Sequence, residues 1–438
     1  MYYWPVNMET LKRTRKKPLT TLRSLVEMAL KAYVLHLSVT REETEDLAEE
    51  MQHQPTQFII DALEEMCDYP KLMKLQRQLL INPWMIDRIL RSRSDNKAKL
   101  VKCFQWLEVF DRTLVSDMVA NYCYKFRKES IRNDSHLLGY EGSLRLGTFL
   151  SETGWHNEAV KVLNVARQQA NQRPLQQLNA MRPQLISQTY VWHPSAYDTS
   201  ASIQTLIAKN NEIPKSFLAS LYLAISICRY ENYNFTFSHE FALMALELLV
   251  EGASSNRLII EVLCHLAKTC VSQKQPRQAK LMITQAVSRA WHNYGPSSVI
   301  YAETLEDYAF YLVMMNSLDD SYAVFSEAVN VLLQVYGPQN LQRSVTKGNL
   351  SFDFYFNCAY IYSDLHMAKD YVRTQIEMNA FDHRLVAAAK HVYVLLEADM
   401  ARFGAVRDCD QMDKYQPVQE QLSVKEVKKL FVEMKDEF

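Results

Sequence analysis

The 438-residue chain has 48% hydrophobic residues, a formal net charge of −1 and only 9 glycines. The near-neutral charge argues against general binding to nucleic acid or to membrane surfaces. Strand-rich folds need glycine at turns and bulges, and proteins average about 7% glycine. A chain this poor in glycine is therefore predicted to be all-α.

No stretch combines the length and apolar character of a secretory leader or of a membrane span. The eight cysteines are scattered without a CxxC pair. Cys264, Cys270 and Cys358 fall in helical patterns, as small buried hydrophobic residues do in a reducing compartment. We expect a cytoplasmic or nuclear protein without membrane insertion.

Residues 1–20 form a basic tail that we expect to be flexible. Its cationic run comprises Lys12, Arg13, Arg15, Lys16 and Lys17. Such a run fits a nuclear import signal or a solvated, disordered tail, and the sequence leaves both open.

Residues 21–75 are predicted to form a short helical docking module. In SLVEMALKAYV (24–34), a helix places Leu25, Ala29 and Tyr33 in one row, four residues apart. Leu25 would project as a knob, and the small Ala29 would allow a partner to approach closely. Packing of this row against neighbouring helices of the same chain is the alternative.

A second helix of this module is expected from the stretch QPTQFIIDALEEM. Pro55 suits the start of the helix, because its missing N–H would have no partner there. Phe58, Ile59 and Leu63 would line the apolar side. Residues 76–138 are interpreted as a helical linker region.

Residues 139–401 carry an internal repeat. YGPS begins at Tyr294 and YGPQ at Tyr336, 42 residues apart. The same offset relates two series of alternating large and small residues, and an upstream stretch has a third series. These are Leu266-Ala267, Cys270, Ala279, Ile283, Ala286; Tyr308-Ala309, Leu312, Ser321, Phe325, Ala328; and Leu146-Gly147, Leu150, Ala159, Leu163, Ala166.

This pattern is that of tetratricopeptide (TPR) repeats, in which each unit is two antiparallel helices and small residues lie where they approach closely. A weaker unit contains Ser226, Ser238, Ala242 and Ala245, and a degenerate one Ala359, Tyr362 and Ala368. We predict a TPR-type α-solenoid of about five units. Residues 170–214 are polar and contain several prolines, so we expect a long connection between helices there.

Residues 402–438 are predicted to be a charged tail that ends in a capping helix. Ser423 and Glu426 have capping-box spacing. Val424, Val427, Leu430, Phe431 and Met434 would line one side of the helix. A helix of this kind suits the open end of a solenoid, and a mobile helix that binds a partner is the alternative.

Motifs of catalysis are missing from the sequence: it has no GxxxxGK[ST] loop, GxGxxG turn, HExxH pair or GxSxG elbow. His265 and His391 lie inside helical patterns, where a core or surface histidine is the simpler interpretation. We expect no enzyme, no metal and no cofactor. An enzyme on a helical-repeat scaffold is an alternative without a catalytic constellation behind it.

The chain resembles the family of amyloid protein-binding protein two, a TPR-containing substrate receptor of cullin-RING ubiquitin ligases. The resemblance is colinear from about residue 21 to 401. It rests on Ser24-Leu25, Ala29-Leu30 and Ala32, then QPTQFIIDAL, LVKCFQWL (100–107), LGTFLSETGW (146–155), AKLMITQAV (279–287), TLEDYAFYL (304–312) and HRLVAAAKHVYVLLEADMA (383–401).

This resemblance implies partners. Leu25, Ala29 and Tyr33 match the family's elongin-binding box, whose leucine enters a pocket on elongin C. Pro55 matches the proline near the start of the cullin-two box, and Phe58 and Ile59 follow it. Elongin B, elongin C and cullin two are therefore the implied partners. The implied substrates are short C-terminal degrons and amyloid precursor protein-like tails, and microtubule association is also implied.

The chain departs from the family in three ways. The spacer between the two boxes is longer and more acidic, and Gln54 precedes the proline where the family has an apolar residue. The family also continues with further TPR units.

A peptide-binding face is expected on the repeat near residue 305. Glu303, Glu306, Asp307 and Phe310 occupy first-helix positions that usually face the concave side. Three carboxylates beside an aromatic ring would suit a basic, extended peptide. A solvated helix face is the alternative.

The sequence therefore favours a substrate-recognition adaptor of a cullin-RING ligase. A cargo adaptor of the kinesin-light-chain type, without a ligase role, is the second hypothesis. The missing heptad coiled coil ahead of the repeats counts against a true kinesin light chain.

Overall fold

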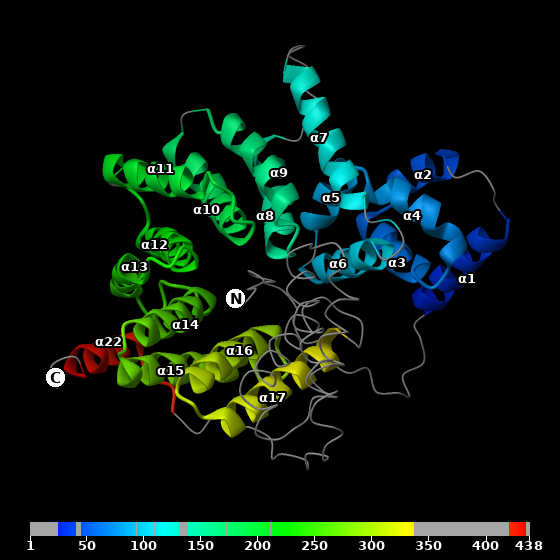
Figure 1. Cartoon of the computed structure of the whole chain (residues 1–438). Helices are drawn as coiled ribbons and strands as arrows, with labels where there is room; N and C mark the ends of the chain where they lie inside the picture. Colours follow the sequence, from blue (N-terminus) through cyan, green and yellow to red (C-terminus); the bar gives the residue numbers. More distant parts are fainter. Residues whose placement is uncertain are drawn as a thin grey trace, which may run out of the picture. The chain divides into compact units, whose positions relative to one another are not determined.

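The computed structural model describes residues 25–40, 45–92, 94–108, 111, 113–130, 139–171, 173–210, 212–336 and 420–434 (Figure 1). Regular secondary structure in these residues is helical throughout, which confirms the predicted all-α class. Of the described helices, none has the length and apolar character to cross a membrane. The basic tail, the degenerate unit at Ala359, Tyr362 and Ala368, and the stretch 383–401 lie outside the described residues, as do Cys358 and His391.

The chain divides into two compact units, one ending at Ala208 and the other beginning at Lys209. The first unit contains α1 (Leu25–Thr40), α2 (Glu45–Gln52), α3 (Thr56–Met66), η1 (Pro70–Leu72), α4 (Met73–Leu80), α5 (Pro83–Leu90), α6 (Ser94–Glu108), α7 (Leu114–Ser130), α8 (Tyr140–Glu152), α9 (His156–Gln169), α10 (Pro174–Tyr190) and α11 (Ala196–Lys209). The second contains α12 (Lys215–Glu231), α13 (Phe235–Leu248), α14 (Asn256–Ser272), α15 (Pro276–Tyr294), α16 (Val299–Met314), α17 (Leu318–Tyr336) and α22 (Val424–Glu433).

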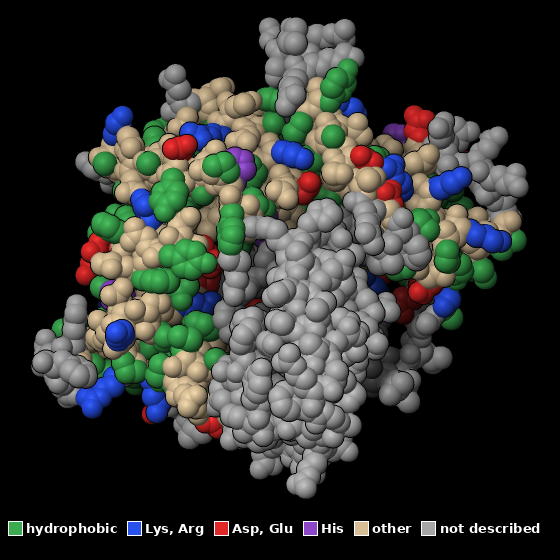
Figure 2. Space-filling model, viewed as in Figure 1, with side chains coloured by type: hydrophobic (Ala, Val, Ile, Leu, Met, Phe, Trp, Pro, Cys, Tyr) green, Lys and Arg blue, Asp and Glu red, His purple; other side chains and the backbone are tan. Residues whose placement is uncertain are grey.

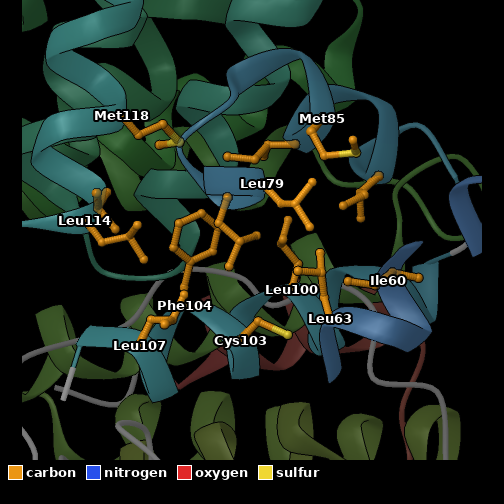
Figure 3. Packing of buried hydrophobic residues seen from close by; sticks show 14 of the residues in the cluster. Ile60, Leu63, Leu79, Met85, Leu100, Cys103, Phe104, Leu107, Leu114 and Met118 are labelled. Atoms are coloured by element: carbon orange, nitrogen blue, oxygen red, sulfur yellow. The ribbon is translucent and has the colours of Figure 1, made fainter. Parts of the chain in front are cut away.

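One aliphatic and aromatic core runs through the first unit from α1 to α9. Leu63 of α3, Leu79 of α4 and Leu100 of α6 meet in it without contact with solvent (Figure 3). Phe104 extends the core towards α8, because its ring lies 6.2 Å from that of Phe149. The boundaries expected at residues 75 and 138 therefore fall inside a single packed body.

The helix pair α8–α9 has the close approach that the repeat pattern predicted. A Cβ added at Gly147 would lie 2.6 Å from Cγ of Leu163, so only glycine fits where these helices meet. This contact joins a small and a large residue of the predicted series, Gly147 and Leu163, across the two helices of one unit.

Residues 170–214 are not the long connection that was expected. They form α10 and α11, and α10 packs against both α8 and α9. Leu178, Met181 and Leu185 bury one stripe of α10. The sequence pattern did not reveal this stripe, because polar residues of the segment are buried as well. Gln184, for example, is buried and donates to Asn164 Oδ1 at 2.7 Å.

The described residues of the second unit form the helix pairs α12–α13, α14–α15 and α16–α17, together with α22. Small residues 12 positions apart touch within two of the pairs. Ser226 Oγ donates to the carbonyl of Ser238 at 2.5 Å, and Ser321 Oγ donates to that of Ala309 at 3.1 Å. Both contacts fall at positions of the predicted repeat, which supports the TPR-type arrangement.

The YGPS motif forms the turn between α15 and α16. Gly295 has φ of 81°, a left-handed conformation that glycine adopts without strain. Ser298 then caps α16 by accepting a hydrogen bond from the backbone N–H of Tyr301 at 3.2 Å. The motif thus ends one helix, and the serine directly after it begins the next.

Candidate docking site on the first helix

The inner face of α1 is fastened to the first unit. Val34 is fully buried and Leu37 nearly so. Tyr33 is half-buried, with its ring 5.4 Å from that of Phe58 on α3. Lys31 Nζ also lies 3.7 Å from a carboxylate oxygen of Glu65. These contacts hold α1 in one rotation about its own axis.

The outer face of α1 is exposed and mostly apolar, with His36 as its polar member. Leu25 is 79% exposed and Val39 75% exposed, and Met28 and Leu35 are also exposed. We call the whole set the outer stripe: Leu25, Met28, Ala29, Ala32, Leu35 and Val39. The spacing of three and four residues keeps these side chains on one side of the helix. Hydrophobic side chains are visible at the surface in the region of α1 (Figure 2).

This arrangement separates the three residues predicted to bind elongin. Leu25 and Ala29 lie on the outer stripe, free to be covered by another molecule. Tyr33 lies at the edge of the stripe and contacts Phe58. Contiguous exposed apolar surface on a folded protein marks a site of interaction.

The residues predicted to bind a cullin lie at the start of α3. Pro55 is exposed at the N-cap, and Phe58 is half-buried under Tyr33. Ile59, in contrast, lies in the core without solvent contact, so it cannot touch a partner while α3 keeps this place. A surface here can use Pro55 and the open part of Phe58.

The turn before Pro55 is held by a residue that sequence reasoning missed. The guanidinium of Arg88 on α5 donates to the carbonyl of Gln52 at 2.6 Å and to that of Gln54 at 2.5 Å. Its Nε donates to Thr56 Oγ1 at 2.9 Å. A long-range clamp on backbone carbonyls has no sequence signature, because any segment offers the same carbonyls.

The acidic set predicted to receive a basic peptide is buried inside the second unit. Glu303 lies 2.8 Å from Nη2 of Arg257, and Asp307 lies 2.5 Å from Nζ of Lys268. Both cations come from α14, so the pairs join two neighbouring helices. Burial raises the pKa of Glu303 to about 7, although the Arg257 guanidinium opposes this shift.

The expectation of an open acidic face is therefore wrong. Glu306 is buried as well, and Phe310 is half-buried. The solvated face considered as the alternative is wrong for the same reason. The carboxylates of Glu303 and Asp307 neutralise cations of the repeat itself.

Across the described residues, no three or more His, Cys, Asp or Glu side chains are placed to hold a metal ion. Cys264 and Cys270 are buried, as expected for small core residues.

Comparison with known proteins supports the resemblance seen in the sequence. Amyloid protein-binding protein 2 of Rattus norvegicus is 23% identical over 328 residues, which cover 72% of this chain and 55% of the relative. The protein of Mus musculus with the same name matches with the same identity and coverage. No protein-family model matches the chain.

The chain is thus a diverged relative of amyloid protein-binding protein 2, and it spans about half the length of the curated relatives it matches. Among solved structures, the quorum sensor NprR from B. thuringiensis in its apo form aligns with a TM-score of 0.43 and 12% identity, over 81% of this chain and 97% of its own. The apo form of RapI aligns with a TM-score of 0.44 and 11% identity, over 81% and 98% of the two chains.

Proposed function

We propose that this protein is a non-enzymatic substrate-recognition subunit of a cullin-RING ubiquitin ligase that binds elongin C through the outer stripe of α1. The observation that carries the proposal is the orientation of the box residues. Leu25 and Ala29 are exposed while the opposite face of the same helix is anchored in the core. The similarity to amyloid protein-binding protein 2 supports it.

The chemistry of the stripe suits a helix-binding partner. Covering an exposed leucine side chain contributes about 1.5–3 kcal/mol, and Leu25 has most of its surface available for this. Ala29 has no side chain beyond Cβ, so a partner backbone can approach the helix at that point. Docking is also favoured because the inner face already fixes α1, which reduces the entropy lost on binding.

The remaining parts of the complex follow the same scheme. Elongin B would accompany elongin C, and cullin two would contact the region of Pro55 and Phe58. Substrate peptides, including tails like that of the amyloid precursor protein, would bind the repeats. The ligase would act in the cytoplasm or the nucleus.

The test is a pull-down of purified elongin B–elongin C complex by the tagged full chain. Leu25→Asp is expected to abolish binding, because it places a charge where an apolar pocket must close. Val26→Asp is the matched control: Val26 is 76% exposed on the same turn but lies to the side of the outer stripe. It should bind like the unaltered chain.

Binding of elongin that survives Leu25→Asp would overturn the proposal, provided that both variants unfold at the same temperature as the unaltered chain. A preparation from cells that retains a kinesin and no elongin would instead support the cargo-adaptor hypothesis.

A further inference from the structure

Within the second unit, α22 packs against helices that are far from it in the sequence. It packs on α15, beside the C-terminal end of α13 (Figure 1). Val424, Val427 and Phe431 turn inward and are buried. The expected cap at the open end of a solenoid is therefore replaced by a position on a helix that has α16 and α17 after it.

Polar side chains on one side of α15 form hydrogen bonds with the backbone of this segment. Gln285 donates through Nε2 to the carbonyl of Glu420 at 3.2 Å, and its Oε1 accepts from the N–H of Leu422 at 2.8 Å. Gln278 donates to the carbonyl of Phe431 at 3.2 Å. Both glutamines are buried, seven positions apart on one side of α15. Backbone contacts of this kind do not depend on which side chains the segment carries.

The N-terminus of α22 meets a fixed anion. The Glu251 carboxylate accepts from the N–H of Val424 at 2.9 Å, and the Arg289 guanidinium holds it in a two-pronged pair at 2.8 and 3.1 Å. Arg289 also donates to the carbonyl of Leu422 at 2.7 Å. A carboxylate at this point is favoured by the helix dipole.

A cation from α22 completes the arrangement at the end of α13. Lys428 Nζ donates to the carbonyls of Glu247 and Leu249 at 2.9 and 2.7 Å. These carbonyls belong to the last turn of α13 and the residue after it, where a positive charge is favoured. Each helix thus satisfies a terminus with a charge supplied by the other element.

We propose that this surface, made by Gln278, Gln285 and Arg289 of α15 with Glu251 and the C-terminal end of α13, is a docking site for amphipathic helices of partner proteins. In this structure α22 occupies the site as a tethered ligand. We call it the α15 groove. The fitting partner helix has a serine or threonine N-cap, apolar side chains at the first, fourth and eighth helical positions, and a lysine at the fifth.

The short length of α22 allows a helix of another protein to take its place. A free helix needs about 12–15 residues to be even marginally stable in water, and α22 has 10. Docking is therefore what orders it. Three buried side chains, one lysine and backbone contacts define the recognition, and an unrelated protein can supply all of them on a helix of its own. This inference stands apart from elongin binding, because it uses no residue of α1.

The probe is a fluorescent peptide of residues 420–434, added to the full chain. Phe431→Asp in the chain vacates the α15 groove, and this variant is expected to bind the peptide at least tenfold more tightly than the unaltered chain, whose own α22 competes. Adding Gln285→Ala to the vacated chain should weaken binding at least tenfold. Glu240→Ala, at an exposed position of α13, is the matched control and should change nothing.

A second measurement needs no altered chain. Hydrogen exchange of residues 424–433 in the unaltered protein should accelerate when unlabelled peptide is added in excess, while exchange in α14 stays constant. The proposal is overturned if a natively folded vacated chain fails to bind the peptide, or if the excess peptide leaves exchange in α22 unchanged.

Discussion

The helices α1 and α22 are two amphipathic elements with opposite fates. The apolar side of α22 is covered by α15, whereas α1 buries one apolar face and leaves a second, the outer stripe, exposed. The two helices belong to different units of the chain. Their difference is therefore in what the surrounding residues supply, since both have the spacing of a helix made to be covered.

The cover of α22 shows what a complement to such a helix requires. It combines apolar contact with groups that satisfy the helix terminus, namely Glu251 and the carbonyls that bind Lys428. The outer stripe of α1 has the apolar part, at Leu25 and Val39 among others. We infer that its complement is supplied by another protein, as the proposed elongin contact requires.

The largest effect is expected where the two faces of α1 are contrasted directly. Val34→Asp would bury a carboxylate without a partner and should destabilise the protein by about 3–5 kcal/mol. Leu25→Asp, on the exposed outer stripe, should change the free energy of unfolding by less than about 0.5 kcal/mol. Urea unfolding followed by circular dichroism measures both.

Equal stabilities of these two variants would mean that the inner face does not anchor α1. The distinction between an anchored face and the outer stripe would then be lost, and with it the argument that α1 is presented to a partner.

A pH titration should separate the two helices next. The Arg289 guanidinium lowers the pKa of Glu251 below its usual value of 4.5. A carboxyl group whose folded pKa is lowered stabilises the docked state fully above its usual pKa, and this contribution is lost as the pH falls through the lower value. Hydrogen exchange in α22, corrected for intrinsic rates, should therefore stay slow from pH 7 to about 5 and accelerate below about 4.5.

The control for this titration is Glu251→Gln, which keeps the shape and removes the charge. It should loosen α22 at neutral pH and flatten the acid-induced change relative to α1. An acid response of α22 that is identical in both proteins would assign the effect to other groups.

The sequence predicted local features far better than long-range ones. Repeat periodicity located Gly147 against Leu163 and the Ser226–Ser238 contact, because small residues at fixed spacing are a direct record of helix approach. The capping box of Ser423 and Glu426 was equally readable and is formed. Each of these depends on residues close together in the chain.

Features that join distant residues could not be read in this way. Arg257 and Lys268 neutralise carboxylates about 40 positions later on a different helix, and nothing in the local pattern marks them as partners. The exposure of Leu25 and the burial of Ile59 could not be predicted either. An apolar residue on a helix does not indicate whether its own chain or another protein covers it. The position of α22 on α15 involves hydrogen bonds of Gln285, and nothing in the sequence around this glutamine marks it as their partner.

The smallest effect is expected from one substitution made in both helices. Ser423 closes a capping box: its Oγ accepts from the N–H of Glu426 at 3.3 Å, and the Glu426 carboxylate accepts from the N–H of Ser423 at 2.9 Å. Ser423→Ala should cost about 1 kcal/mol and raise the undocked fraction of α22 roughly fivefold, seen as faster exchange there. Ser38 in α1 instead donates to the carbonyl of Leu35 at 2.7 Å inside the helix, where alanine is the better helix former, so Ser38→Ala should be neutral or slightly stabilising. If Ser423→Ala leaves exchange in α22 unchanged or slows it, the capping box does not contribute and docking on α15 alone orders α22.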